Sequence, residues 1–155
     1  MLLILPAVNA EAKEVSLVKG DAIRYMGYST HYYYVDGNLA FCLEPDMKSP
    51  GTGVYSASEL DPRSHLSKAM YYMSGGPGYE QYIKSSLTGG WGEDANAYCL
   101  THCVLSYIYD GCDQNSAAFK GLNADIASAV VMYADYVKNL PDIPDAELAF
   151  SENGL

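Results

Sequence analysis

The dipeptide Asp36-Gly37 constrains the fold of this chain more than any other feature, because it separates two β-prone runs by only two residues. The run before it reads HYYYV and the run after it reads NLAFCL. Asp-Gly supplies the positive φ angles of a type I′ turn, so the segment predicts a tight β-hairpin. In this hairpin Tyr33 is expected opposite Ala40, and His31 opposite Cys42. Alternation then places the Cys42 thiol on the same face as His31 and Tyr33.

The remaining secondary structure is predicted from periodicity and from turn residues. Weak alternation over residues 14–28 predicts one or two strands, and the Pro-, Gly- and Ser-rich residues 44–60 predict a loop. Helices are expected over residues 61–73, starting at Asp61-Pro62, and over 79–86, 95–109 and 123–138, with a strand entry at 146–150. This order predicts an α+β domain, a small antiparallel β unit with an inserted helical bundle.

Length and charge limit the classes of function. A chain of 155 residues is long enough for one domain with its own core. Its formal net charge of −10 repels phosphate backbones and anionic lipids, so we expect neither nucleic-acid binding nor peripheral membrane binding. We expect no membrane insertion, because the apolar run at the N-terminus is too short to span a bilayer. The 15 tyrosines suit a binding surface or an amphipathic core equally well, and composition leaves both readings open.

The first ten residues, MLLILPAVNA, resemble the end of a secretory signal peptide. A short apolar run is followed by a small-x-small pattern, Val8-Asn9-Ala10, which predicts cleavage after Ala10. The alternative is a buried N-terminal strand. The first reading predicts an exported domain over residues 11–155. Because AFSENGL, residues 149–155, reads as the start of a strand, we expect this domain to lack its C-terminal strands and further domains to follow.

Four cysteines in an exported chain are compatible with two disulfides. Cys99 and Cys103, however, are four residues apart on a predicted helix, a geometry that suits a direct bridge poorly. His102 and Ser106 share their side of that helix, but zinc needs four converging ligands and the segment lacks a CxxC pair. We expect small residues packed at a helix crossing here, and no metal or other cofactor.

Two motifs, in this order, resemble the thioester domains of Gram-positive bacterial surface adhesins. FCLEP, residues 41–45, has the aromatic–Cys–apolar form of that family's reactive strand. LTHCVLSY, residues 100–107, resembles its TQxA-type helical motif, with His102 where glutamine is usual. KAMYYMSGGPGY, residues 68–79, resembles the helix and turn between these motifs, and the whole resemblance covers residues 15–137.

The resemblance implies an internal thioester between Cys42 and a glutamine side chain. Such a domain captures an amine on a host surface protein, or another amine-bearing ligand, once and covalently, so it is not an enzyme. It acts as an adhesin, secreted or on the cell-wall surface. The family's glutamine follows the helices in a late strand, whereas this chain has only Gln81 and Gln114, neither of which is predicted in such a strand.

The same resemblance assigns roles to residues around the thiol. Tyr33 and Phe41 are expected to shield the bond from water, and Thr101 belongs to the binding motif. His31 and His102 are candidates for proton transfer or for support of the site.

Two other readings of Cys42 remain open at this point. The first is a hydrolase or acyltransferase that pairs Cys42 with His31 or His102, although no Gly-rich oxyanion turn leads into a helix that begins with cysteine. The second is a noncovalent, tyrosine-rich module for glycans or proteins, in which the cysteines are merely buried or bridged.

Overall fold

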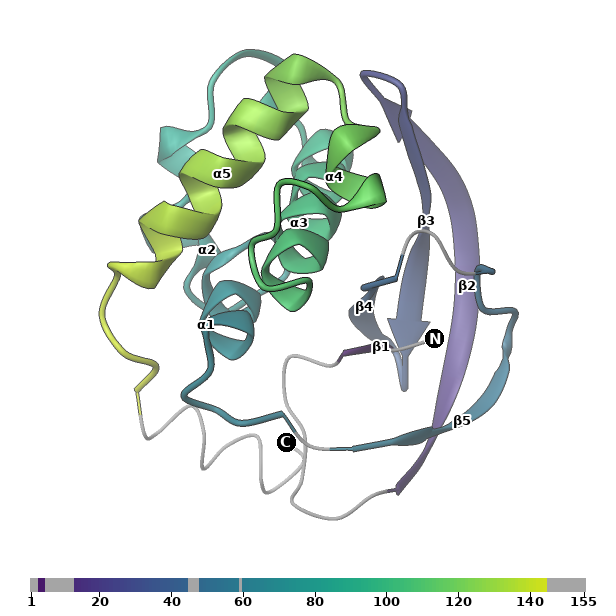
Figure 1. The fold of residues 1–155 in the computed structure, drawn as a ribbon. Helices are drawn as coiled ribbons and strands as arrows, with labels where there is room; N and C mark the ends of the chain where they lie inside the picture. Colours follow the sequence, from purple (N-terminus) through teal and green to yellow (C-terminus); the bar gives the residue numbers. More distant parts are fainter. Residues whose placement is uncertain (1–2, 5–12, 45–47, 59, 145–155) are drawn as a thin grey trace.

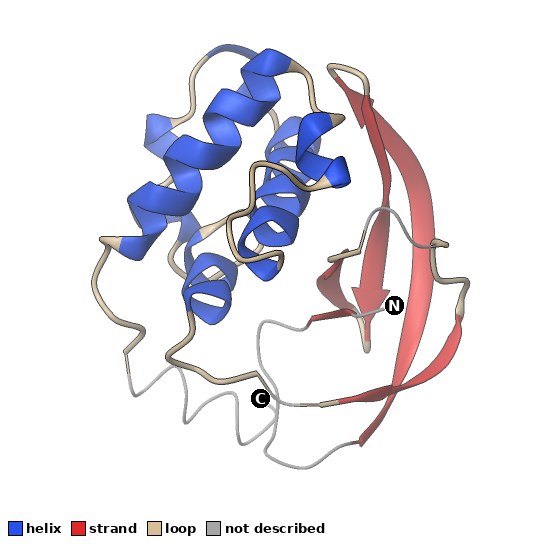
Figure 2. Cartoon of the chain, in the orientation of Figure 1, coloured by secondary structure: helices blue, strands red, loops and turns tan. Residues whose placement is uncertain are grey.

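The computed structural model describes residues 3–4, 13–44, 48–58 and 60–144, and shows a sheet on one side and a block of helices on the other (Figures 1 and 2). Within this part of the chain, every strand precedes every helix. The predicted α+β class, with a small antiparallel β unit and a helical bundle, is confirmed. The strand entry expected at residues 146–150 lies outside the described residues.

The sheet has five antiparallel strands in the order β1-β4-β3-β2-β5. Their bounds are β1 (Leu3–Ile4), β2 (Lys13–Tyr25), β3 (Tyr28–Val35), β4 (Asn38–Cys42) and β5 (Gly53–Ala57). The alternating segment is one long strand, β2, whose register shifts between Lys19 and Ala22. β5 lies inside the predicted loop, so that prediction was wrong: its pairing with β2 outweighs the local preference of a Gly- and Ser-rich segment.

Two hairpins form the centre of the sheet. Asp36 and Gly37 have φ angles of 50° and 83°, which confirms the predicted two-residue turn between β3 and β4. Met26 and Gly27, with φ angles of 50° and 86°, form a second such turn between β2 and β3 that the sequence analysis did not identify. At the edge of the sheet the backbone of β1, which lies within the expected leader, pairs with β4.

The helical block follows the sheet in the chain. It consists of α1 (His65–Tyr72), α2 (Tyr79–Tyr82), α3 (Asp94–Tyr109), α4 (Ala117–Lys120) and α5 (Ala124–Lys138), with 3-10 turns η1 (Lys84–Ser86) and η2 (Gly89–Gly92). The first helix starts later than predicted, because Ser64 caps it by accepting a hydrogen bond from the Ser67 amide. Asp61 instead accepts from the Arg63 amide in the preceding turn. The short helix α4 was not predicted.

Helix α3 lies at the centre of the molecule. It packs against β2, β3 and β4 on one side and against α1 and α5 on the other (Figure 1). This position explains why α3 is apolar or small on nearly every side, as the sequence predicts for a buried helix. The predicted apolar stripe of α5 is also buried and consists of Ile126, Val130, Tyr133 and Val137.

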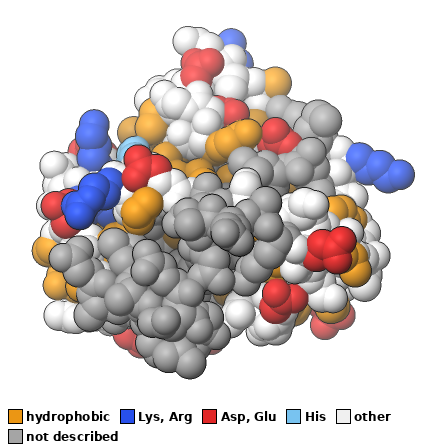
Figure 3. Space-filling model, turned by 90° about the horizontal axis from the view of Figure 1, so that it is seen from below, with side chains coloured by type: hydrophobic (Ala, Val, Ile, Leu, Met, Phe, Trp, Pro, Cys, Tyr) orange, Lys and Arg blue, Asp and Glu red, His pale blue; other side chains and the backbone are white. Residues whose placement is uncertain are grey.

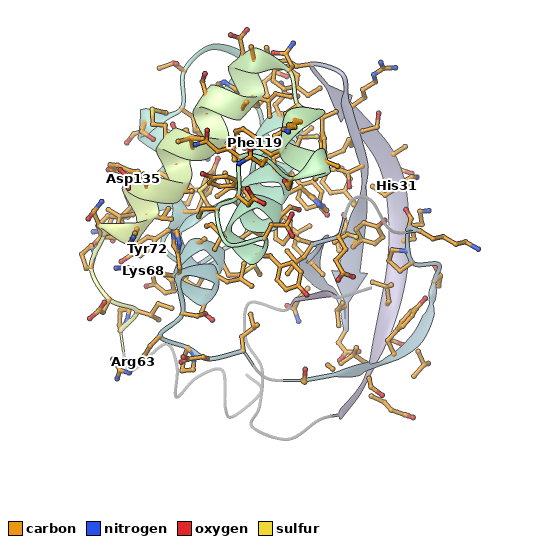
Figure 4. All side chains as sticks on the ribbon, viewed as in Figure 1. His31, Arg63, Lys68, Tyr72, Phe119 and Asp135 are labelled. Atoms are coloured by element: carbon orange, nitrogen blue, oxygen red, sulfur yellow. The ribbon has the colours of Figure 1, made fainter. Side chains whose placement is uncertain are left out.

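Two hydrogen bonds connect α1, the first helix of the bundle, to the end of α5 and the segment that follows it. The Tyr72 hydroxyl donates to the Pro141 carbonyl at 2.5 Å, and the Lys68 ammonium donates to the Lys138 carbonyl at 3.1 Å. Figure 4 labels Lys68 and Tyr72 on this side of the helical block. Among the described residues, no helix combines the length and the apolar character needed to cross a membrane.

The sheet buries side chains on both of its faces, as the predicted alternation requires. Phe41 and Leu43 belong to the main core under the helices. Tyr33, Ala40 and Cys42 belong to a smaller cluster on the opposite face, where Tyr55 of β5 packs against them. The Cys42 side chain is therefore buried on the opposite face from the main core, although its backbone adjoins α3.

Candidate functional site

Cys42 is one of the residues that line a half-open cavity of about 210 Å³. Strand β3 contributes most of its lining, with Tyr28, Ser29, Thr30, His31 and Tyr33. Ala22, Cys42, Ser49 and His102 complete the lining from β2, β4, the following loop and α3. The structure thus brings together four of the residues singled out in the sequence: Cys42, His31, His102 and Tyr33.

The Tyr98 hydroxyl inserts between β3 and β4 beside this cavity. It accepts a hydrogen bond from the Tyr33 amide at 3.2 Å and donates to the Ala40 carbonyl at 2.8 Å. The His31 carbonyl lies 3.1 Å from the same hydroxyl oxygen. One helical side chain therefore satisfies backbone groups that direct pairing of the two strands would otherwise use.

This insertion corrects one detail of the predicted hairpin. Tyr33 pairs with Ala40 as expected, but the ladder between the two strands ends at this pair. His31 pairs with Ala22 on the β2 side of β3, and Cys42 pairs with Leu3 on the β1 side of β4, but the β3–β4 ladder does not include the two residues. The predicted cross-strand His31–Cys42 pair is therefore not formed, although both residues line the cavity.

His102 holds the backbone of Cys42. Its Nδ1 lies 3.2 Å from the Cys42 carbonyl oxygen, which can only accept, so we assign the ring proton to Nδ1. Nε2 is then left to accept from the Thr30 hydroxyl at 3.5 Å. Burial lowers the pKa of His102 to about 3, against the opposing effect of the bond to Cys42. The ring is therefore neutral near pH 7 and fixes strand β4 against α3.

The Cys42 thiol is buried and protonated near neutral pH. Burial raises its pKa, and the nearby Glu44 charge acts in the same direction, while a hydrogen bond to the Glu44 carbonyl at 3.9 Å opposes both. A thiol in such surroundings disfavours the charged thiolate. Chemistry at this sulfur therefore requires a proton acceptor or donor within the cavity.

His31 differs from His102 in its surroundings. It is half-buried on β3, and its ring centroid lies 6.4 Å from that of Tyr33, whose hydroxyl donates to Ser49 at 3.2 Å. Figure 4 labels His31 on the sheet side of the molecule. Among the described residues, the His31 ring makes no hydrogen bond, whereas the His102 ring makes two. The His31 ring thus lines the cavity from β3, while the ring of His102 is held by Cys42 and Thr30.

Two predicted site residues lie outside the cavity. Phe41 points to the helical side, where its ring centroid lies 4.9 Å from that of Tyr98 and 5.2 Å from that of His102. Thr101 donates to the Ala97 carbonyl at 2.8 Å and accepts from the Ser74 amide at 3.2 Å, so it joins α3 to the end of α1. Both residues support α3 or His102 rather than contacting the thiol.

The structure also describes the other three cysteines and both glutamines. All four cysteines are free, with Cys112 exposed and the other three buried. Gln81 is exposed on α2, and Gln114 donates to the Tyr107 hydroxyl at 3.5 Å, so neither lines the cavity. In the part of the chain that the structure describes, no three His, Cys, Asp or Glu side chains are arranged to hold a metal ion.

Sequence reasoning missed Tyr98 and Tyr28. Tyr98 precedes His102 by four residues, so the helical repeat places both on one face of α3, and this spacing was the available signal. Tyr28 is half-buried and lines the cavity together with Cys42. Burial first, and then the nearby Cys103, Cys42 and Cys99, raise the pKa of Tyr28. No pattern around Tyr28 in the sequence predicts that neighbourhood.

One of three comparisons with known proteins found a match. A family model described as "Thioester domain" matches residues 14–144, a segment that includes Cys42, His102 and all the described helices. The search of curated proteins and the search of solved structures each found no match.

Proposed function

Because the chain belongs to the thioester-domain family, we propose that Cys42 forms an internal thioester with which the domain captures an amine on a partner surface covalently. The observation that carries this proposal is the cavity that the protonated Cys42 thiol and the half-buried His31 both line. Family membership favours binding of this kind over catalytic turnover.

The bond forms by acyl transfer from a glutamine. The Cys42 sulfur attacks the side-chain amide carbon, the carbon–nitrogen bond breaks, and the thiol proton leaves with the nitrogen as ammonia. Since neither Gln81 nor Gln114 lines the cavity, we place the acyl partner on a glutamine outside residues 1–155. Under this proposal, that glutamine lies in a strand of the polypeptide downstream of this segment, where further domains are also expected.

The surroundings of the Cys42 sulfur favour the uncharged thioester over the charged thiolate. Burial disfavours the thiolate that hydrolysis would release, and the Cys42 side chain itself is only 8% exposed, which limits the access of water to the sulfur. When an amine attacks the carbonyl carbon, the carbon–sulfur bond breaks and the sulfur must leave as a neutral thiol. The attacking nitrogen loses a proton and the sulfur gains one, so the reaction needs a proton carrier but no external reactant.

We assign this proton transfer to His31. It lines the cavity, whereas the Nδ1 proton of His102 is engaged by the Cys42 carbonyl and the ring of His102 is buried and neutral. His102 thus acts as a positioning residue for strand β4. Tyr33 encloses the cavity as expected of a shielding residue, while Phe41 and Thr101 contribute through the packing of α3.

Charge supports a lysine-bearing partner. The net charge of −10 attracts cationic surfaces, and Figure 3 shows acidic side chains at several separate places on one face of the molecule. None of the described residues that line the cavity is acidic. The Glu44 charge acts on Cys42 from nearby, so it attracts an approaching lysine ammonium, which must lose a proton before the amine reacts. Such a partner is expected on a host surface, with this domain secreted or on the cell wall.

Labelling with a fluorescent primary amine tests the proposal in the full-length protein. The wild-type protein and a Cys112→Ala control should incorporate one amine per domain, and Cys42→Ala should incorporate none. Absence of labelling in the wild type, or labelling that persists in Cys42→Ala, would overturn the proposal.

A further inference from the structure

A second cavity, of about 200 Å³, lies among β3, α3 and the segment that contains α4, and it is half open to the surface. Figure 4 labels Phe119, one of its lining residues, in the helical block. Tyr28 lines this cavity as well as the Cys42 cavity, so the two are neighbours. The proposed thioester chemistry uses none of the α3 or α4 residues found here.

The buried and half-buried part of the lining is mostly apolar. The rings of Tyr107 and Phe119 lie with centroids 5.2 Å apart and planes inclined at 36°, and Ala118 and Leu122 belong to the same lining. A dry apolar cavity of roughly 150 Å³ accepts a benzene-sized molecule, so the present volume accommodates one ring or a short aliphatic chain. This part of the cavity therefore suits an apolar group.

Asp110 is the one acidic residue among the described residues that line the cavity. It is exposed at the C-cap of α3, directly after Tyr109. Asp110 already interacts within the chain, but a carboxylate offers roughly four acceptor sites and can take a further hydrogen bond. A ligand in the half-open cavity can therefore combine apolar contacts with a carboxylate partner.

The end of α3 adds to the negative potential at this place. The carbonyl end of a helix carries a partial negative charge, and the last turn of this 16-residue helix contains no basic residue. None of the described residues that line the cavity is lysine, arginine or histidine. A cation is therefore favoured beside Asp110, and an anion is disfavoured.

The two serines of the lining do not select the ligand. The Ser106 hydroxyl is covered by surrounding atoms, so a group in the cavity cannot reach it. The Ser116 Oγ accepts a hydrogen bond from the Phe119 amide at 3.2 Å as the N-cap of α4. Selection therefore rests on the apolar wall and on Asp110.

We propose that this cavity binds a monocationic amine on an apolar stem, with the apolar group against Tyr107 and Phe119 and the ammonium beside Asp110. Aromatic faces also attract ammonium groups, so the two parts of the site favour the same ligand. Two sources share this chemistry: a free aralkyl amine and a lysine side chain of a partner protein. The site does not depend on whether a thioester forms.

Ligand-observed NMR on the full-length protein tests the proposal with N,N-dimethyl-2-phenylethylamine. A tertiary amine cannot form a stable amide with a thioester, so its binding is separate from capture at Cys42. The wild type should bind it saturably and prefer it to 2-phenylethanol by roughly 2- to 5-fold, the value of an exposed ion pair. This preference should largely disappear at about 1 M salt, which screens exposed charges.

Three variants locate the site. Asp110→Asn should still bind 2-phenylethanol but should lose the preference for the amine. Asp135→Asn, at an exposed position of α5 labelled in Figure 4, removes the same charge elsewhere and should behave as the wild type. Ala118→Leu should weaken the binding of both ligands by filling the cavity. The unfolding midpoint of each variant shows whether it is folded, and the salt dependence of the wild type needs no variant.

The dimethylated form of N-acetyllysinamide, which is also a tertiary amine, distinguishes the two sources. If it competes with the phenylethylamine, the cavity accepts a lysine side chain; if it does not, the ligand is a free aralkyl amine. Failure of the wild type to bind the phenylethylamine saturably would overturn the proposal, as would a preference that survives in Asp110→Asn or at high salt. Amine labelling at Cys42 is a separate measurement, so failure of one proposal leaves the other standing.

Discussion

The Nδ1 atom of His102 lies 3.2 Å from the carbonyl oxygen of Cys42. One turn earlier on α3, the hydroxyl of Tyr98 lies 2.8 Å from the carbonyl oxygen of Ala40. Both side chains bond to the backbone of β4 from the same face of α3. Helix α3 thereby holds the strand that carries the thiol, while the insertion of Tyr98 separates β3 from β4 at the cavity.

Replacing His102 should destabilise the fold, and the loss should be smaller when the new side chain can donate a hydrogen bond to the Cys42 carbonyl. His102→Ala leaves the buried Cys42 carbonyl without a donor and opens a cavity, so we expect a loss of about 2–4 kcal/mol. His102→Gln, the residue usual in the resembling motif, keeps a donor and should lose about 1 kcal/mol. Urea unfolding measures both values. Equal losses in the two variants would show that the bond to Cys42 does not position the strand.

The lowered pKa of His102 should make the stability of the fold depend on pH. The folded protein keeps His102 neutral down to about pH 3, whereas the unfolded chain binds a proton below about pH 6.5. The unfolded state therefore binds more protons between these values, and stability falls as the pH is lowered. Between pH 7 and pH 5 we expect His102 to contribute a loss of about 2 kcal/mol to the free energy of unfolding.

His102→Gln is the matched control for this pH effect. The other titratable groups are the same in both proteins, so the difference between their pH profiles isolates His102. The variant should lose stability less steeply than the wild type between pH 7 and pH 5. Parallel profiles would contradict the assignment of a buried, neutral imidazole.

Removing the Tyr98 hydroxyl should weaken the junction between the two strands. Tyr98→Phe keeps the ring in the core but leaves the Tyr33 amide and the Ala40 carbonyl without their partner. We expect a loss of about 1–3 kcal/mol, and faster hydrogen exchange at the Tyr33 amide. Tyr136→Phe, on the exposed face of α5, is the control and should change stability little. A Tyr98→Phe variant as stable as this control would mean that the strands close and pair directly.

His31 should determine the rate of amine capture but not the stability of the fold. His31→Ala removes the proposed proton carrier, so the rate of amine labelling should fall roughly 100-fold. Added imidazole should restore part of this rate, because the small base can enter the space left by the side chain. The unfolding midpoint should change little, since His31 is half-buried. Unchanged labelling in His31→Ala would exclude it as the proton carrier.

How far the sequence predicts this structure depends on how local each feature is. The turn at Asp36-Gly37 is fixed by the φ angles of two residues, and the buried helix α3 by its own composition, so both were predictable. Strand β5 was not, because GVYSA becomes a strand only through its pairing with the distant β2. The insertion of Tyr98 was also missed, since sequence spacing places a side chain on a helix face but does not show that it separates two strands.

The sequence predicted which residues form the candidate site, but it did not predict which of them contact one another. Motif resemblance selected Cys42 and His102, and hairpin alternation selected His31 and Tyr33, all of which line one cavity. Sequence could not separate the roles of the two histidines. Their difference arises from burial: His102 lies under the sheet and bonds to the Cys42 carbonyl, whereas His31 lies at the cavity in a half-buried position.

The intact mass of the full-length protein, measured before and after incubation with methylamine, tests the central claim most directly. The account predicts a mass one ammonia below that of the mature sequence, a gain of one methylamine after incubation, and neither change in Cys42→Ala. A full sequence mass that methylamine does not alter would contradict the account. So would a deficit of two hydrogens that a reductant reverses, because Cys42 would then be part of a disulfide.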